Sequence, residues 1–215
     1  MLWSGLLFST GSFLLVLAFR WVNPPGSAFI ALYEIQQDQS AMQLWVPLED
    51  ISPWLQVSVI ASEDQKFPRH FGFDIESIQK SLDENSSRPR GASTITQQVA
   101  KNLFLWNGRS YIRKGIEAWF TLLIEVLWSK ERILEVYLNI AEFGPGVYGA
   151  EAAAQTFFGK AASQLAPLEA GTLAAVLPNP KRMSAAKPSA YVQSRAYTIY
   201  KMADKLGGTT YLQNL

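Results

Sequence analysis

The chain has 215 residues, enough for one domain plus an accessory segment. With 48% hydrophobic and 13% aromatic residues, it can bury a sizeable core. Its formal net charge of +1 argues against a nucleic-acid-binding protein, which usually has a clear basic excess. The absence of cysteine and the single histidine exclude thiol nucleophiles, disulfides, cysteine-bound zinc and His-rich metal sites. Any chemistry must therefore use carboxylates, hydroxyls, amides, lysine or arginine.

The N-terminal segment is strongly apolar, with no ionisable side chain in residues 2–19. A helix of this length spans about 27 Å, close to the hydrocarbon thickness of a bilayer. Trp3 and Trp21 lie near its ends, where aromatic rings favour the membrane interface. We predict an uncleaved transmembrane anchor over residues 1–22. A cleaved signal peptide is the alternative, although no small-residue cleavage site follows directly.

The next segment, residues 23–44, is predicted to be a linker close to the membrane. It opens with a stiff proline-containing spacer and contains a short helical pattern over residues 28–35. Residues 45–215 are predicted to form the main domain, because the longer amphipathic patterns all lie there.

A polar stretch over residues 61–74 holds two adjacent carboxylates, Glu63 and Asp64, and the single histidine, His70. It follows a predicted helix that opens at Ser52 with proline at its first position. An apolar run leads up to Glu63, so its carboxylate is expected to be desolvated and suited to proton transfer. The alternative is a solvated turn after an ordinary helix.

The following segment is predicted to be a helix over residues 75–82 and then a breaker-rich loop over residues 83–91. A loop of this composition is either a plain connector or a lid that closes over a substrate.

Another predicted helix, ending near residue 104, begins at Ser93 or Thr94. Gln97, Gln98 and Lys101 share its polar face with Thr94. Hydroxyl, amide and ammonium groups near a helix start suit a phosphate or sugar ligand. A solvated amphipathic face explains the same spacing.

The helix over residues 112–127 has the clearest amphipathic pattern. Arg113 and Lys114 lie four and three residues before Glu117, so the three side chains can meet on one face. They form either a surface ion pair or a carboxylate held ionised by cations that bind an anionic substrate. The predicted inward-facing stripe comprises Ile112, Ile116, Trp119, Leu123, Val126 and Leu127.

The remainder of the chain is predicted to be helical apart from a glycine-rich turn at residues 143–149. The turn lacks the strand and the Lys-Ser/Thr pair of a nucleotide-binding loop. The fold class is therefore mainly α, with helices packed about a cleft. The predicted helices cover residues 130–139, 150–158, 167–177 and 188–206.

Five stretches in order, spread over about residues 45–185, together resemble glycosyltransferase family 51, the peptidoglycan transglycosylases, and within it the monofunctional biosynthetic type. The resemblance implies a lysozyme-like helical domain over residues 45–215 with a small membrane-associated jaw region. The stretches are residues 63–72, 91–102, 113–117, 130–139 and 149–175.

This family polymerises lipid II, the undecaprenyl-diphosphate-linked disaccharide-peptide, into β-1,4-linked glycan with inversion and release of undecaprenyl diphosphate. The resemblance thus implies a cell-wall enzyme on the inner (cytoplasmic) membrane, single-pass, with its catalytic domain on the periplasmic face. Its partners would be lipid II, the growing strand, the membrane, and proteins of wall synthesis or division. No organic cofactor is implied.

The resemblance also implies roles for individual residues. Glu63 would take the proton from the acceptor's 4-hydroxyl. Glu117 would lie near the donor diphosphate and assist its departure directly or through a divalent cation, Mg²⁺ or Mn²⁺. The implied substrate-binding residues are Asp64, His70, Ser93, Thr94, Gln97, Gln98, Lys101, Arg113 and Lys114.

Two other functions remain open at this point. A lysozyme-type cell-wall hydrolase would use Glu63 as a general acid and would not need the three cations. A non-catalytic membrane scaffold of the wall-synthesis machinery would need neither the base nor the cations.

Overall fold

The computed structural model describes residues 2–76, 79, 93–108 and 110–215, and it is mainly helical, as predicted. The helices are α1 (Leu2–Ala18), α2 (Ala28–Gln37), α3 (Pro53–Glu63), α5 (Ile95–Phe104), α6 (Tyr111–Leu127), α7 (Lys130–Ile140), α8 (Ala150–Phe158), α9 (Pro167–Val176) and α10 (Ala190–Lys205). The short 3₁₀ helices are η1 (Leu48–Asp50), η2 (Phe67–Arg69), η3 (Ala162–Gln164) and η4 (Gly208–Asn214).

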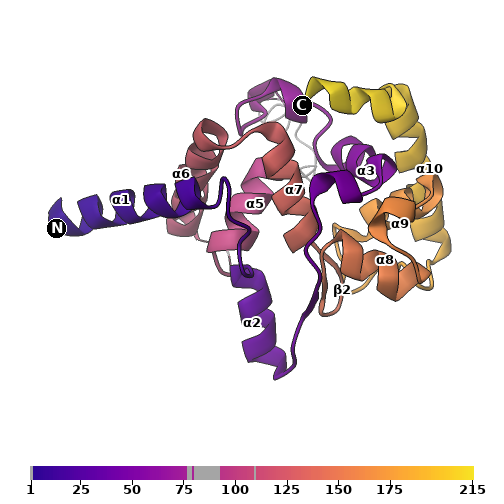
Figure 1. Ribbon diagram of the computed structural model, residues 1–215, viewed down its shortest axis with the longest axis horizontal. Coiled ribbons are helices and arrows are strands. Elements are labelled where there is room, and N and C mark those ends of the chain that lie inside the picture. Colours follow the sequence, from indigo (N-terminus) through magenta and orange to yellow (C-terminus); the bar gives the residue numbers. More distant parts are fainter. Residues whose placement is uncertain (1, 77–78, 80–92, 109) are drawn as a thin grey trace.

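Two groups of helices make up the body of the molecule. Helices α5, α6 and α7 pack together, and α3, α9 and α10 form the second group (Figure 1). Helix α8 packs against η3. Helices α9 and α10 approach closely because Gly171 lies against α10: a Cβ there would be 2.7 Å from the Ala196 carbonyl oxygen. The C-terminal end of α3 meets the beginning of α5 where the two groups join. The predicted site residues lie at this junction.

A small three-stranded sheet joins the ends of the two groups, in the order β1 (Met42–Gln43), β3 (Val147–Tyr148), β2 (Glu142–Gly144). The glycine-rich turn is therefore a hairpin, and the extended piece before α3 pairs in parallel with it. Asn139 fixes this arrangement, because its side chain exchanges hydrogen bonds with the backbone of Val46 at 3.0 and 2.9 Å. Gly149 closes the hairpin with φ +87°, where a Cβ would be 2.9 Å from the Asn139 carbonyl oxygen.

Helix α1 extends away from the body but docks along α6 on one side (Figure 1). The indole of Trp119 donates to Ser12 Oγ at 3.0 Å, and that of Trp128 donates to the Val16 carbonyl at 2.8 Å. Phe8 packs edge-on against Phe120. The helix predicted over residues 2–19 thus forms. In the described part of the chain, however, no helix is both long enough and apolar enough to cross a bilayer.

The buried face of α6 differs from the predicted one. Ile112 and Val126 are 77% and 65% exposed, whereas Glu117, Phe120 and Glu125 are buried. Four residues of the predicted stripe, Ile116, Trp119, Leu123 and Leu127, do pack against the core, so the prediction is wrong only at Ile112 and Val126. A hydropathy pattern does not mark Glu117 and Glu125 as buried, because they are carboxylates that are neutralised locally. Most of the helix predicted at 75–82 and the whole loop predicted at 83–91 lie outside the described residues.

Candidate active site

Helix α3 brings Glu63 to the junction of the two helical groups. Residues 55–61 of α3 are buried, so the carboxylate emerges from the core at the last turn. Desolvation by this burial raises the pKa of Glu63 above its ordinary value of 4.5, although the Gln98 hydrogen bond and the charge of Arg195 oppose the shift. A carboxylate whose charged form is poorly solvated has increased proton affinity, which suits it to act as a general base.

The Glu63 carboxylate is oriented by its neighbours. Gln98 on α5 donates to Glu63 Oε2 at 3.0 Å, and the Tyr137 hydroxyl on α7 donates to the Gln98 amide oxygen at 3.2 Å. Burial raises the pKa of Tyr137 well above its usual value, so the phenol stays a proton donor at neutral pH. The Ser62 hydroxyl makes a longer bond of 3.4 Å to Glu63 Oε1. Three helices thus fix one carboxylate.

Asp64 has a different role from its neighbour, because it is buried and fully engaged. Its Oδ2 accepts the backbone N–H of Ile95, the first residue of α5, at 2.9 Å. His70 Nε2 lies 2.8 and 3.0 Å from the two Asp64 oxygens. Asp64 therefore connects the end of α3 to the start of α5, and His70 supports it from the following loop. This geometry gives both residues a supporting position beside Glu63.

Thr94 rather than Ser93 caps α5. Thr94 and Gln97 form a reciprocal capping box, with bonds of 3.0 and 3.2 Å between side chain and backbone. The Thr94 hydroxyl also donates to the Gly72 carbonyl at 2.7 Å. Both side chains are buried and used internally, whereas Ser93 is exposed. Of the predicted polar face, Gln98 and Lys101 are the members directed toward Glu63 and the cations.

Lys101 feels the charges of two carboxylates, Glu117 and Glu63. Desolvation lowers its pKa, the charges of Glu117 and Glu63 oppose this shift, and those of Arg113 and Lys114 reinforce it. Its ammonium is 5.4 Å from the centre of the Phe29 ring on α2. A partly desolvated cation with two nearby cations favours an incoming anion, since the anion relieves their mutual repulsion.

Glu117 is the anchor of the cationic cluster on α6. The Arg113 guanidinium donates to Glu117 Oε2 at 2.8 Å, and the Lys114 ammonium donates to Glu117 Oε1. Arg113 is mostly buried, and its Nε has no partner in the described part of the chain. Arg113, Lys114 and Glu117 therefore meet on one face of α6, as predicted. We define Lys101, Arg113 and Lys114, together with Glu117, as the cationic cradle.

A cavity of about 190 Å³ opens beside Lys101. Gln98, Lys101 and Tyr137 contribute polar groups to it, and Phe29 and Pro178 contribute apolar surface. This combination of flat apolar walls and a few directed polar groups is typical of a site for a polar organic ligand.

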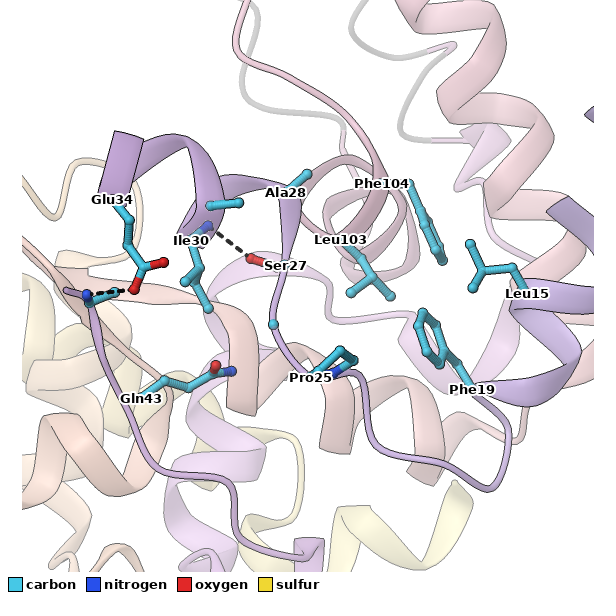
Figure 2. Close-up of a pocket in the computed structure, with 13 residues that line it drawn as sticks. Leu15, Phe19, Pro25, Ser27, Ala28, Ile30, Glu34, Gln43, Leu103 and Phe104 are labelled. Carbon is cyan, nitrogen blue, oxygen red and sulfur yellow. Dashed lines mark hydrogen bonds between the residues drawn. The ribbon is translucent and has the colours of Figure 1, made fainter. Parts of the chain in front are cut away.

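A larger hollow of about 660 Å³ lies between the end of α1, α2 and α5. Figure 2 shows Leu15, Phe19, Leu103 and Phe104 lining it together, and the rings of Phe19 and Phe104 stack at 6.2 Å. Leu103 and Phe104 follow Lys101 on α5. The hollow lies along α5 from the cradle and is apolar on the side of Leu15, Phe19, Leu103 and Phe104, whereas Glu34 and Gln43 line its other side (Figure 2).

Sequence analysis missed two residues of this site. Arg195 on α10 contributes a positive charge felt by Glu63 and is held by the Ala175 carbonyl at 3.3 Å. Tyr137 is fully buried, as a core residue would be, yet its hydroxyl also orients Gln98. No local pattern distinguishes these residues, because their helices reach the site only through tertiary packing.

The donor set fits a metal ion poorly. Both Glu117 oxygens already accept from cationic side chains. The described residues include no group of three His, Cys, Asp or Glu side chains able to hold a metal. A single carboxylate paired with two cations is a weak ligand for Mg²⁺ or Mn²⁺, which bind through several oxygen atoms.

Comparison with known proteins gives consistent matches over nearly the whole chain. The family model for transglycosylases matches residues 30–203. The biosynthetic peptidoglycan transglycosylase of Pseudomonas putida W619 is 57% identical over 215 residues, 97% of this chain and 91% of that protein. The enzyme of the same name from Pseudomonas entomophila L48 is 55% identical over 98% of this chain and 92% of its own length. The enzyme of the same name from Xanthomonas campestris pv. campestris B100 is 54% identical over 97% of this chain and 88% of its own length.

Proposed function

Because the chain belongs to the transglycosylase family, we propose that it is a peptidoglycan glycosyltransferase that polymerises lipid II into β-1,4-linked glycan strands for cell-wall synthesis. The observation that carries this proposal is that Gln98, which donates to Glu63 at 3.0 Å, and Lys101 of the cradle lie on one helix and line one cavity. A base and a diphosphate-binding cluster side by side are what transfer from a lipid diphosphate requires.

Glu63 accepts the proton of the acceptor's 4-hydroxyl as that oxygen attacks the anomeric carbon of the donor strand. The bond from that carbon to the diphosphate breaks, and undecaprenyl diphosphate leaves with its charge held by the cationic cradle. A diphosphate needs no general acid when its developing charge is neutralised in this way. Direct displacement inverts the anomeric centre and needs no covalent intermediate.

Glu117 keeps Arg113 and Lys114 in place for the diphosphate. A divalent cation would have Glu117 as its protein ligand and would depend on diphosphate oxygens for the remainder. Since the donor set fits a metal poorly, we assign the neutralisation to the three cationic side chains. Polymerisation measured with and without EDTA tests this assignment: a loss of more than about tenfold on chelation would transfer that role to a metal.

We further propose that α1 attaches the enzyme to the cytoplasmic membrane, single-pass as the sequence predicts, with a lysozyme-like domain and its jaw region on the periplasmic face. Its free side carries large exposed apolar residues such as Trp3 and Leu7, which are 79% and 73% exposed. The apolar hollow beside α5 suits the polyprenyl chain of lipid II. Flotation with anionic liposomes, compared with a Leu6→Ser, Leu7→Ser, Leu14→Ser variant, tests the attachment.

Incubation of the purified full chain with labelled lipid II tests the main proposal. Formation of polymer, lost in Glu63→Gln, is expected. Release of sugars from finished glycan without polymer formation would favour a hydrolase, and inactivity on both substrates would favour a scaffold.

A further inference from the structure

A second buried ion pair lies behind the site, outside the machinery described above. Glu125, at the end of α6, accepts from the Lys130 ammonium at 2.8 Å. The Glu125 side chain is 3% exposed and that of Lys130 is 17% exposed. Two ionisable groups this deeply buried are costly to desolvate, and replacing such a pair by apolar residues is often neutral or stabilising. Their presence therefore calls for a role besides stability.

Lys130 contacts the loop that follows α3. Its ammonium donates to the His70 carbonyl at 2.8 Å and lies 4.6 Å from the centre of the Phe67 ring. It thus holds the backbone of the residue whose imidazole bonds to Asp64.

Glu125 contacts the first turn of α5. Its Oε1 accepts the Thr96 hydroxyl at 2.6 Å. The loop also packs directly against α6 at Gly72: a Cβ there would be 2.8 Å from Thr121 Cγ2 and 3.0 Å from Glu125 Cγ. One ion pair therefore connects α5, α6, α7 and the loop that carries His70.

We propose that Glu125 and Lys130 are positioning residues for glycosyl transfer, an inference that rests on the proposed function. They act through His70 and Asp64, which in turn hold the end of α3 against the first residue of α5. Because Glu63 directly precedes Asp64, and Gln98 and Lys101 belong to α5, this chain of contacts sets the distance between the base and the cradle. A displacement of about 1 Å at a reacting group can cost on the order of 100-fold in rate.

Steady-state kinetics on lipid II test the proposal. For Lys130→Met we expect kcat to fall about 10- to 100-fold, with KM changed less than about threefold, because the cradle itself is intact. Lys160→Met is the matched control, since Lys160 forms a more exposed ion pair with Glu169 at 2.9 Å, outside this chain of contacts. It should leave kcat unchanged.

The double variant Glu125→Gln, Lys130→Met separates positioning from stability. The single change Lys130→Met leaves Glu125 buried and unpaired and should lower the melting temperature. The double variant leaves no unpaired buried ion, so its melting temperature should return toward that of the wild type. The catalytic rate should stay low, because nothing holds the His70 carbonyl. Recovery of kcat together with stability, or an unchanged kcat in Lys130→Met, would overturn the proposal.

His70 is the only histidine, so its imidazole gives a readout that does not depend on activity. In protein with ¹⁵N-labelled histidine, the ring resonances of Lys130→Met should shift from those of the wild type, and those of Lys160→Met should not. Unchanged ring resonances in Lys130→Met contradict the inference. A wild-type protein that fails to polymerise lipid II contradicts only the proposed function.

Discussion

The Arg113 guanidinium and the Glu117 carboxylate meet at 2.8 Å, one turn apart on α6, with the carboxylate buried. Lys114 occupies the second carboxylate oxygen, so Glu117 orders two cations at once. Lys101 on α5 lies close enough to feel all three charges. An anion entering this cluster meets charges that are already oriented.

Replacing Lys101 by methionine should weaken both substrate binding and turnover. A hydrogen bond to a charged group contributes about 1.5–3 kcal/mol, so kcat/KM should fall roughly 10- to 100-fold. Lys205→Met, on an exposed part of α10, is the control. A Lys101→Met enzyme with normal kcat/KM would remove Lys101 from the cradle.

Removal of the base should have a larger effect. General base catalysis typically contributes about 10²–10⁴-fold, so Glu63→Gln should lower kcat by this amount while lipid II still binds. Binding is measured with labelled lipid II under single-turnover conditions. Glu49→Gln, an exposed carboxylate in η1, serves as the comparison. Activity retained to within about twofold would exclude Glu63 as the base.

The pH dependence of the rate follows from the raised pKa of Glu63. The base must be ionised, so the acidic limb of kcat/KM should lie above pH 4.5, the ordinary value. Gln98→Leu deletes the hydrogen bond that favours the ionised form, and the limb should move to still higher pH. A limb that moves to lower pH, or does not move, would contradict the assigned geometry.

The same shift makes a prediction about stability. Because the folded protein binds the Glu63 proton more tightly than the unfolded chain, the contribution of this group is fully present below pH 4.5 and is lost as pH rises through the folded pKa. Glu63→Gln should therefore raise the melting temperature above that of the wild type at pH 8. At pH 4 this gain should be smaller. Melting curves at the two pH values check this.

The link between α1 and the body depends on Arg132. Its guanidinium donates to the Phe19 carbonyl at 3.1 and 2.9 Å, to the Val22 carbonyl at 3.0 Å and to Asn23 Oδ1 at 2.9 Å. Arg132→Met should loosen residues 19–27 and accelerate limited proteolysis there several-fold, about the effect of losing 1 kcal/mol of local stability. Proteolysis at wild-type rates would mean that the contacts of α1 with α6 suffice.

Sequence reasoning recovered the elements whose signals are local. Helix α5 starts after Thr94, one of the two predicted caps, and α3 has proline at its first position, as predicted. Helices α8 and α9 match the predicted ranges to within one residue. The predicted Ser52 cap is an exception: its hydroxyl donates to the Leu165 carbonyl instead of to α3. A tertiary partner thus displaced a local one.

What the sequence could not provide depends on packing between distant segments. The inward face of α6 was predicted only in part, because Glu117 and Glu125 are buried with their own counter-charges. The β2–β3 hairpin was seen only as a turn, since its strands are too short for an alternating pattern. The domain boundaries at residues 22 and 44 remain predictions.

The two oxygens of Glu63 are not equivalent. Oε2 receives the 3.0 Å bond from Gln98, whereas Oε1 receives only the 3.4 Å contact from Ser62. The oxygen with the weaker bond is the more basic, so in the proposed mechanism Oε1 is the one that takes the proton of the acceptor hydroxyl. A single amide, that of Gln98, therefore selects which oxygen of the proposed base faces the acceptor.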